Sequence, residues 1–135
     1  STKRYSVDYC LFMSICAEYN VDLIPKKLIK YRIHGGNLSH TVRELEWTEQ
    51  KETLDYIFNK FPNYKTVYPL GYAKAYARVF YYKARYYISI GRRREAILIL
   101  RRNMYVDPFY FCLFFLSLFP LPVWDYVHKK LRRFS

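Results

Sequence analysis

The chain has 135 residues, with 23 Lys and Arg against 11 Asp and Glu, a net charge of +12 and an aromatic content of 21%. An apolar share of 52% excludes a globally disordered chain, because disordered sequences lack aromatic and branched aliphatic residues. The first eight residues are mostly polar and no apolar signal segment follows them, so no secretory signal is expected there. The start at Ser1 without Met leads us to expect a fragment of a longer protein.

The strong positive charge restricts the classes of partner. Basic chains usually bind phosphate groups in nucleic acid, at an anionic membrane surface or in a phosphorylated ligand. The sequence shows no helix-turn-helix, zinc-finger or ribonucleoprotein pattern, so we expect no nucleic-acid partner. An odd number of cysteines without metal-binding spacing indicates reduced thiols.

The N-terminal part begins with a helix. Val7, Leu11 and Ile15 recur at helical spacing and predict an amphipathic helix over residues 7–19. Further along, Val21–Ile24 predicts a short strand that ends before a proline. The alternation over residues 28–34 predicts a second strand, which the following Gly-Gly pair ends.

From about Thr41 the pattern is helical only. Thr41 and Glu44 form a capping box at the start of a helix over residues 42–61. A second long helix is predicted over residues 72–90, ended by a glycine, and a third over residues 92–104. The Asp-Pro pair that follows predicts the start of another helix, with proline at the first helical position.

The second and third of these helices resemble one tetratricopeptide-type hairpin. Small residues allow the two helices to approach closely, and glycine allows the turn between them. One unit is visible, whereas a solenoid needs about three, so an ordinary helical hairpin is the favoured interpretation. The residues of the pattern are Ala77, Ala84, Tyr87, Gly91, Ala96 and Pro108.

The C-terminal part combines an uncharged aromatic run with a basic cluster. The run Phe109–Trp124 is too short to be a clear membrane span and contains two prolines. An apolar segment followed by a basic cluster favours contact with an anionic membrane, and the alternative is a buried helix with a solvated tail. The predicted membrane residues are Phe115, Phe119, Trp124, Lys129, Lys130, Arg132 and Arg133.

Two residues are candidates for chemistry. His34 ends the second predicted strand, where it could bind a divalent cation or simply form a hydrogen bond. Asp8 lies in the first turn of a helix, as a general base or as an acid favourably placed at the positive end of the helix dipole.

The stretch VDYCLFMSICAEYNVDLIPKKLIKYRIHGGNLS, residues 7–39, resembles the end of the catalytic domain of family 2 glycosyltransferases. These are inverting enzymes with the GT-A fold. The matching features are the acid and tyrosine at the helix start, the Leu-Phe pair, and the Tyr-Arg-x-His strand with its Gly/Asn/Ser loop. Val7 and Cys10 stand where the family usually has acids. The helices that follow resemble, less specifically, the helical tail of bacterial surface-polysaccharide transferases.

The resemblance implies a role for five residues. Asp8 would be the catalytic base that deprotonates the acceptor hydroxyl, and His34 would lie near the nucleotide diphosphate and its metal. Arg32, Asn37 and Ser39 would support the loop or bind substrate. The full-length enzyme would use Mg or Mn, a nucleotide-sugar donor and a glycan or lipid-linked acceptor. No cofactor is expected on this chain alone, because the nucleotide-binding half is missing.

We therefore expect a mainly α chain with a short β-hairpin or two-strand remnant of a GT-A α/β domain. Residues 1–40 would form the edge of the catalytic domain, 41–106 a helical extension, and 107–135 a membrane-associating tail. The predicted function is part of a glycosyltransferase in surface polysaccharide synthesis, peripheral at the cytoplasmic face of the cell membrane and inactive alone. The alternative is a tetratricopeptide-like adaptor at a membrane.

Overall fold

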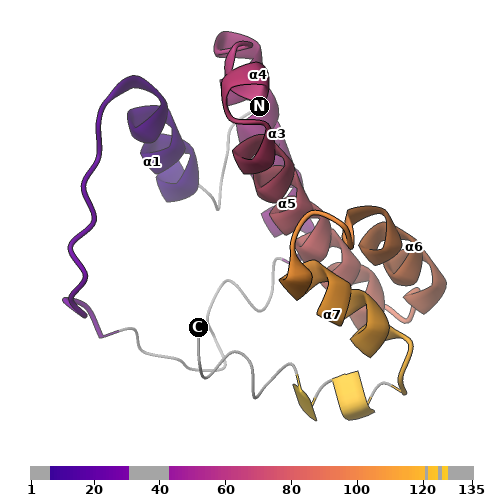
Figure 1. Cartoon of the computed structure of the whole chain (residues 1–135). Helices are drawn as coiled ribbons and strands as arrows, with labels where there is room; N and C mark the ends of the chain where they lie inside the picture. Colours follow the sequence, from indigo (N-terminus) through magenta and orange to yellow (C-terminus); the bar gives the residue numbers. More distant parts are fainter. Residues whose placement is uncertain (1–6, 31–42, 121, 125, 128–135) are drawn as a thin grey trace. The chain divides into compact units, whose positions relative to one another are not determined.

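The computed structural model describes residues 7–30, 43–120, 122–124, 126 and 127. Over these residues the chain is mainly helical and contains no strand, which confirms the predicted mainly α class (Figure 1). The chain divides into two compact units, Ser1–Pro69 and Leu70–Ser135, each of which is described below by itself.

The first unit contains α1 (Val7–Glu18), α3 (Arg43–Lys60) and the short α4 (Tyr64–Val67). Helix α1 lies against α3, and two side-chain contacts hold the C-terminal end of α1. Lys60 forms an ion pair with Glu18, and the Tyr64 hydroxyl donates a hydrogen bond of 2.6 Å to the carbonyl oxygen of Ala17. The predicted helices over 7–19 and 42–61 are confirmed, whereas α4 was not predicted.

Helix α1 does not have the buried apolar face that an amphipathic helix requires. None of its residues is fully buried, and Val7, Leu11 and Phe12 are each more than half exposed. Its apolar side chains are spread around the helix instead of forming one stripe. The spacing therefore identified the helix correctly but not its packing.

The segment after α1 has no regular secondary structure as far as residue 30. The strand predicted at Val21–Ile24 is therefore wrong. The second predicted strand is absent over residues 28–30, and its remainder lies outside the described residues, as does Thr41 of the predicted capping box. A strand needs a partner for its backbone N–H and C=O groups, which the alternation of side chains alone does not supply.

The second unit contains α5 (Pro69–Ser89), α6 (Arg93–Asn103) and α7 (Pro108–Ser117). The turn between α5 and α6 is made by Gly91, whose φ of 78° is in the left-handed region that favours glycine. The turn is closed by a 2.8 Å hydrogen bond from the Arg92 N–H to the Tyr87 carbonyl oxygen. The three predicted helix starts and the glycine stop are confirmed within three residues.

The second unit has a core of its own. Ala77 and Ala84 on α5 and Ala96 on α6 are fully buried, so small side chains lie where these helices contribute to the core. Large side chains from α6 and α7, with Trp124, complete it. The members of this core are Ala77, Ala84, Ala96, Leu100, Tyr110, Leu113 and Trp124.

Candidate functional site

The candidate base Asp8 lies at the start of α1, in the first turn. Its side chain is exposed, and its Oδ1 accepts a 2.8 Å hydrogen bond from the N–H of Tyr9. A carboxylate at a helix N-terminus is favoured by the positive end of the helix dipole. The position leaves the second carboxylate oxygen available to accept a proton from a substrate hydroxyl.

The other residues of the predicted glycosyltransferase site, Arg32, His34, Asn37 and Ser39, lie outside the described residues. Whether they approach Asp8 therefore stays a prediction. The described part of the chain contains no group of three or more His, Cys, Asp and Glu residues that could hold a metal ion.

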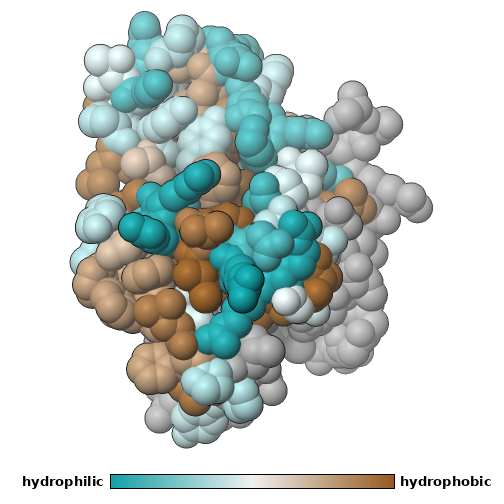
Figure 2. Space-filling view, turned by 90° about the vertical axis from the view of Figure 1, so that its right-hand side faces the viewer, coloured by the Kyte–Doolittle hydropathy of each residue, from teal (hydrophilic) through white to brown (hydrophobic). Residues whose placement is uncertain are grey.

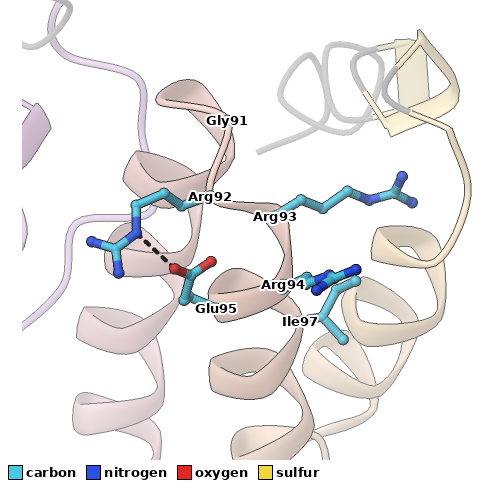
Figure 3. Close-up of a pocket in the computed structure, with 6 residues that line it drawn as sticks. All are labelled: Gly91, Arg92, Arg93, Arg94, Glu95 and Ile97. Atoms are coloured by element: carbon cyan, nitrogen blue, oxygen red, sulfur yellow. Dashed lines mark hydrogen bonds and ion pairs between the residues drawn. The ribbon is translucent and has the colours of Figure 1, made fainter.

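The turn between α5 and α6 contains a cluster of three arginines that lines an open pocket with Gly91, Glu95 and Ile97 (Figure 3). Arg92 is paired with Glu95, with 2.7 Å between Nε and Oε1, and its guanidinium lies 4.9 Å from the Tyr87 ring centroid. The hydrogen bond between the two side chains raises the pKa of Arg92 and lowers the pKa of Glu95. Arg92 is thus engaged within the protein.

Arg93 connects α6 to the end of α7. Its guanidinium donates hydrogen bonds of 2.9 and 3.2 Å to the Ser117 carbonyl oxygen and a further bond to that of Phe119. Ser117 is the last residue of α7 and Phe119 lies two residues beyond it, where intrahelical donors are lacking. In Figure 3 the Arg93 side chain points toward the α7 side, away from Arg92. This capping role could not be predicted from the sequence, because an Arg-Arg-Arg run looks the same whether or not it has a distant carbonyl partner.

The start of α7 is also held by a charged contact. Asp107 caps the helix by accepting a 3.0 Å hydrogen bond from the Phe109 N–H. Its Oδ2 lies 2.7 Å from the Nζ of Lys74 on α5. The hydrogen bond from Lys74 and the one from the Phe109 backbone lower the pKa of Asp107. An uncharged helix is therefore fixed at both ends by charged residues of the second unit.

The predicted membrane residues have different environments. Phe115 and Phe119 are exposed, whereas Trp124 is 4% exposed and packs in the core, so Trp124 does not contribute to the surface. Trp124 lies in the segment after α7, where its backbone N–H donates a hydrogen bond of 3.3 Å to the Pro120 carbonyl oxygen. Four basic residues of the prediction lie outside the described residues: Lys129, Lys130, Arg132 and Arg133.

The length and the apolar character of a helix decide whether it could cross a membrane. None of the helices in the described residues is both long enough and apolar enough to cross a bilayer. Figure 2 looks onto the side that carries α6 in Figure 1, and on this face hydrophilic and hydrophobic residues lie next to each other.

The chain was compared with known proteins at the levels of family, sequence and structure. No protein family matches it, and no curated protein and no solved structure matches it.

Proposed function

We propose that this chain is the C-terminal part of a family 2 glycosyltransferase that moves a sugar from a nucleotide-sugar donor to a glycan or lipid-linked acceptor in surface polysaccharide synthesis. The observation that carries the proposal is the resemblance of residues 7–39 to the end of that catalytic domain. A confirmed helix begins at Val7 and presents Asp8 exposed in its first turn, which is the placement that the resemblance requires for a base.

The exposure of the N-terminal part supports a missing packing partner. The large apolar side chains from Val7 to Ile29 include many that are more than half exposed, and Leu23 and Ile29 are almost fully exposed. Extensive exposed apolar surface usually marks an interface. The nucleotide-binding half of the enzyme would cover it.

The proposed chemistry assigns one task to each residue. Asp8 removes the proton from the attacking acceptor hydroxyl, which makes the oxygen a stronger nucleophile in a single displacement. Arg32, Asn37 and Ser39 bind substrate or hold the loop. Near His34 a bound Mg or Mn ion would supply stabilisation of the charge on the departing diphosphate.

The test uses the longer protein that includes these residues. We expect Asp8→Asn to lower transfer from a nucleotide sugar by about 10²- to 10⁴-fold, the usual contribution of a general base. Asp22→Asn is the matched control, because it removes an exposed carboxylate from the same unit and should leave turnover unchanged. Equal turnover of the Asp8 variant and the parent would contradict the assignment of the base.

The proposal that this chain is only part of a longer enzyme has its own test. We expect the 135-residue chain to show no transfer alone, and the coding sequence upstream of Ser1 to contain an Asp-x-Asp after a strand. Sugar transfer by the chain itself, or an upstream sequence without strand and helix alternation, would overturn it.

A second candidate is a tetratricopeptide-like adaptor at a membrane. The α5–α6 hairpin favours it, since Ala77, Ala84 and Ala96 are buried as that repeat pattern requires and Gly91 makes the turn. Repeats need neighbours, so further sequence with a period of about 34 residues would support the adaptor, and its absence would leave an ordinary hairpin.

The proposed location is peripheral, at the cytoplasmic face of the cell membrane. A lipid-linked acceptor and the basic C-terminal sequence both favour this position. We expect the protein to sediment with membranes and to be released by high salt. Recovery in the soluble fraction at low salt would contradict it.

A further inference from the structure

Helix α7 has two faces that are both apolar. The face with Tyr110, Leu113 and Ser117 is buried in the second unit. The opposite face consists of Phe111, Cys112 and Phe115 and continues past the helix end with Leu118 and Phe119, and all five are exposed. We call these five residues the outer stripe. Their spacing places the first three on one side of the helix.

The outer stripe is uniform in chemistry. The run from Pro108 to Trp124 contains no charged residue, and the rings of Phe111 and Phe115 lie 4.7 Å apart between centroids. The stripe has no hydroxyl, amide or indole group to form a hydrogen bond with a partner. Protein interfaces usually include such groups, with tyrosine, tryptophan and arginine as anchors.

The stripe is held in place rather than loosely attached. Asp107 and Lys74 fix the start of α7, and Arg93 fixes its end through the carbonyls of Ser117 and Phe119. The apolar side chains are therefore presented from a helix whose position is already set before any partner binds, which lowers the entropy lost on binding.

The unit that carries the stripe is strongly basic in sequence. The residues from Leu70 to Ser135 include 13 Lys and Arg against 3 Asp and Glu. On α6, which packs beside α7, Arg94, Arg101 and Arg102 are exposed. This charge disfavours a second copy of the same unit as the partner and complements an anionic surface.

We propose that the outer stripe is the docking surface for an anionic lipid membrane, with the phenylalanines in the headgroup and acyl boundary and the α6 arginines at the headgroups. The membrane would meet one face of α7 only, while Tyr110, Leu113 and Trp124 stay in the core. This surface is independent of sugar transfer, and vesicle binding is measured without donor or acceptor, so a negative transfer assay leaves it standing.

The decisive experiment uses Cys112, which lies in the outer stripe and is exposed. In a Cys10→Ser/Cys16→Ser background, a polarity-sensitive fluorophore on Cys112 should shift to the blue on phosphatidylglycerol-containing vesicles and should be quenched by brominated lipid. The matched control carries the fluorophore on Cys16, which is exposed in the first unit, in a Cys10→Ser/Cys112→Ser background. This control should not respond.

Binding variants give a second measurement by vesicle sedimentation. Phe111→Ser/Phe115→Ser should weaken binding about tenfold for each phenylalanine, given the free energy of burying an aromatic side chain. The control Leu23→Gln/Ile29→Gln replaces two apolar residues of the first unit, which are even more exposed than the phenylalanines, and should leave binding unchanged.

The charge variants follow the same design. Arg101→Gln/Arg102→Gln should weaken binding about fivefold per charge. Lys26→Gln/Lys27→Gln makes the same charge change in the first unit and should have less effect.

Three results would overturn the proposal. The first is a Cys112 fluorophore that stays unshifted on vesicles that carry the protein. The second is equal binding to phosphatidylcholine alone. The third is a dimer in the absence of vesicles that Phe111→Ser/Phe115→Ser abolishes, which would assign the stripe to a second copy. Circular dichroism of each variant checks that the fold is kept.

Discussion

The two units of the chain differ in charge and in how completely they bury their apolar residues. Ser1–Pro69 has 10 Lys and Arg against 8 Asp and Glu, so almost all of the net charge of +12 belongs to Leu70–Ser135. The second unit packs α5, α6 and α7 around a shared core. In the first unit α1 has no fully buried residue.

This difference shows that the composition of the whole chain is an average over two units with different properties. Apolar residues of α5, α6 and α7 form the core that stabilises the second unit, while the outer stripe on α7 stays exposed. Apolar residues at the start of the first unit lie largely on the surface, and their contribution to stability is correspondingly small. The overall charge of the chain is thus a property of one unit, and it is the unit that carries the exposed stripe.

The largest effect is expected from a core leucine of the second unit. Leu100→Ala should lower the free energy of unfolding by about 2–5 kcal/mol, because it leaves a cavity among α6 and α7. Leu98→Ala on the same helix and Leu11→Ala on α1 should each cost less than about 0.5 kcal/mol. Both of these leucines are 56% exposed, against 1% for Leu100.

Urea unfolding followed by circular dichroism measures these differences. If Leu11→Ala cost as much as Leu100→Ala, α1 would be packed as tightly as the second unit, and the contrast between the units would be lost.

The next effect is expected at the turn between α5 and α6. A Cβ at Gly91 would meet no atom within 4 Å, so Gly91→Ala should cost only the left-handed backbone strain, about 1–2 kcal/mol. Gly71→Ala, in the first turns of α5, should have the opposite sign and stabilise by up to about 1 kcal/mol. A stabilising Gly91→Ala, seen as a raised melting temperature, would contradict the left-handed turn.

A smaller effect is expected at Asp107, and it depends on pH. The folded-state pKa of Asp107 is lowered below its ordinary value of 3.8, mainly by Lys74. Its contribution is therefore complete above 3.8 and is lost as the pH falls through the lower folded-state pKa. Asp107→Asn keeps a capping side chain but should remove this acid dependence, and Asp107→Ala should remove the cap as well.

The urea midpoint, measured from neutral to acidic pH, tests this prediction. Lys74→Gln supplies the matched comparison: it should have little further effect in the Asp107→Asn background. Unchanged acid dependence in Asp107→Asn would show that other carboxyl groups control it.

The smallest effect is expected where α1 meets α3. Lys60 and Glu18 form a half-exposed ion pair, and the hydrogen bond to Glu18 raises the pKa of Lys60 above 10.5. Its contribution is present below that value and is lost as the pH rises through the higher folded-state pKa. Glu18→Gln should change stability little and not at all in high salt. A large, salt-independent loss in thermal unfolding would mean that the first unit is held together by this pair.

Sequence periodicity located the long helices well because each has a clear start or stop. Gly91 and the Asp107-Pro108 pair act through local backbone geometry, which the sequence alone specifies. The strand at Val21–Ile24 was wrong because a strand depends on a partner that is distant in sequence. The partners of Arg93 and the burial of Trp124 were missed for the same reason: both depend on how α6 and α7 meet.

The candidate site also has one part that local sequence predicts and another part that depends on long-range contacts. Asp8 could be placed in a first helical turn from local pattern alone, and the structure confirms that placement. Its grouping with Arg32, His34, Asn37 and Ser39 depends on long-range contacts and stays a prediction.

The contact from Arg93 to Ser117 also has a consequence for the order in which the second unit folds. It joins residues 24 apart in the sequence, one at the start of α6 and one at the end of α7, so it forms only after both helices and the turn between them are in place. Closing such a loop costs entropy before the hydrogen bonds offset it, which places this contact late in folding. We expect Arg93 to act chiefly by slowing unfolding, so that it sets how long α7 stays attached once the unit has formed.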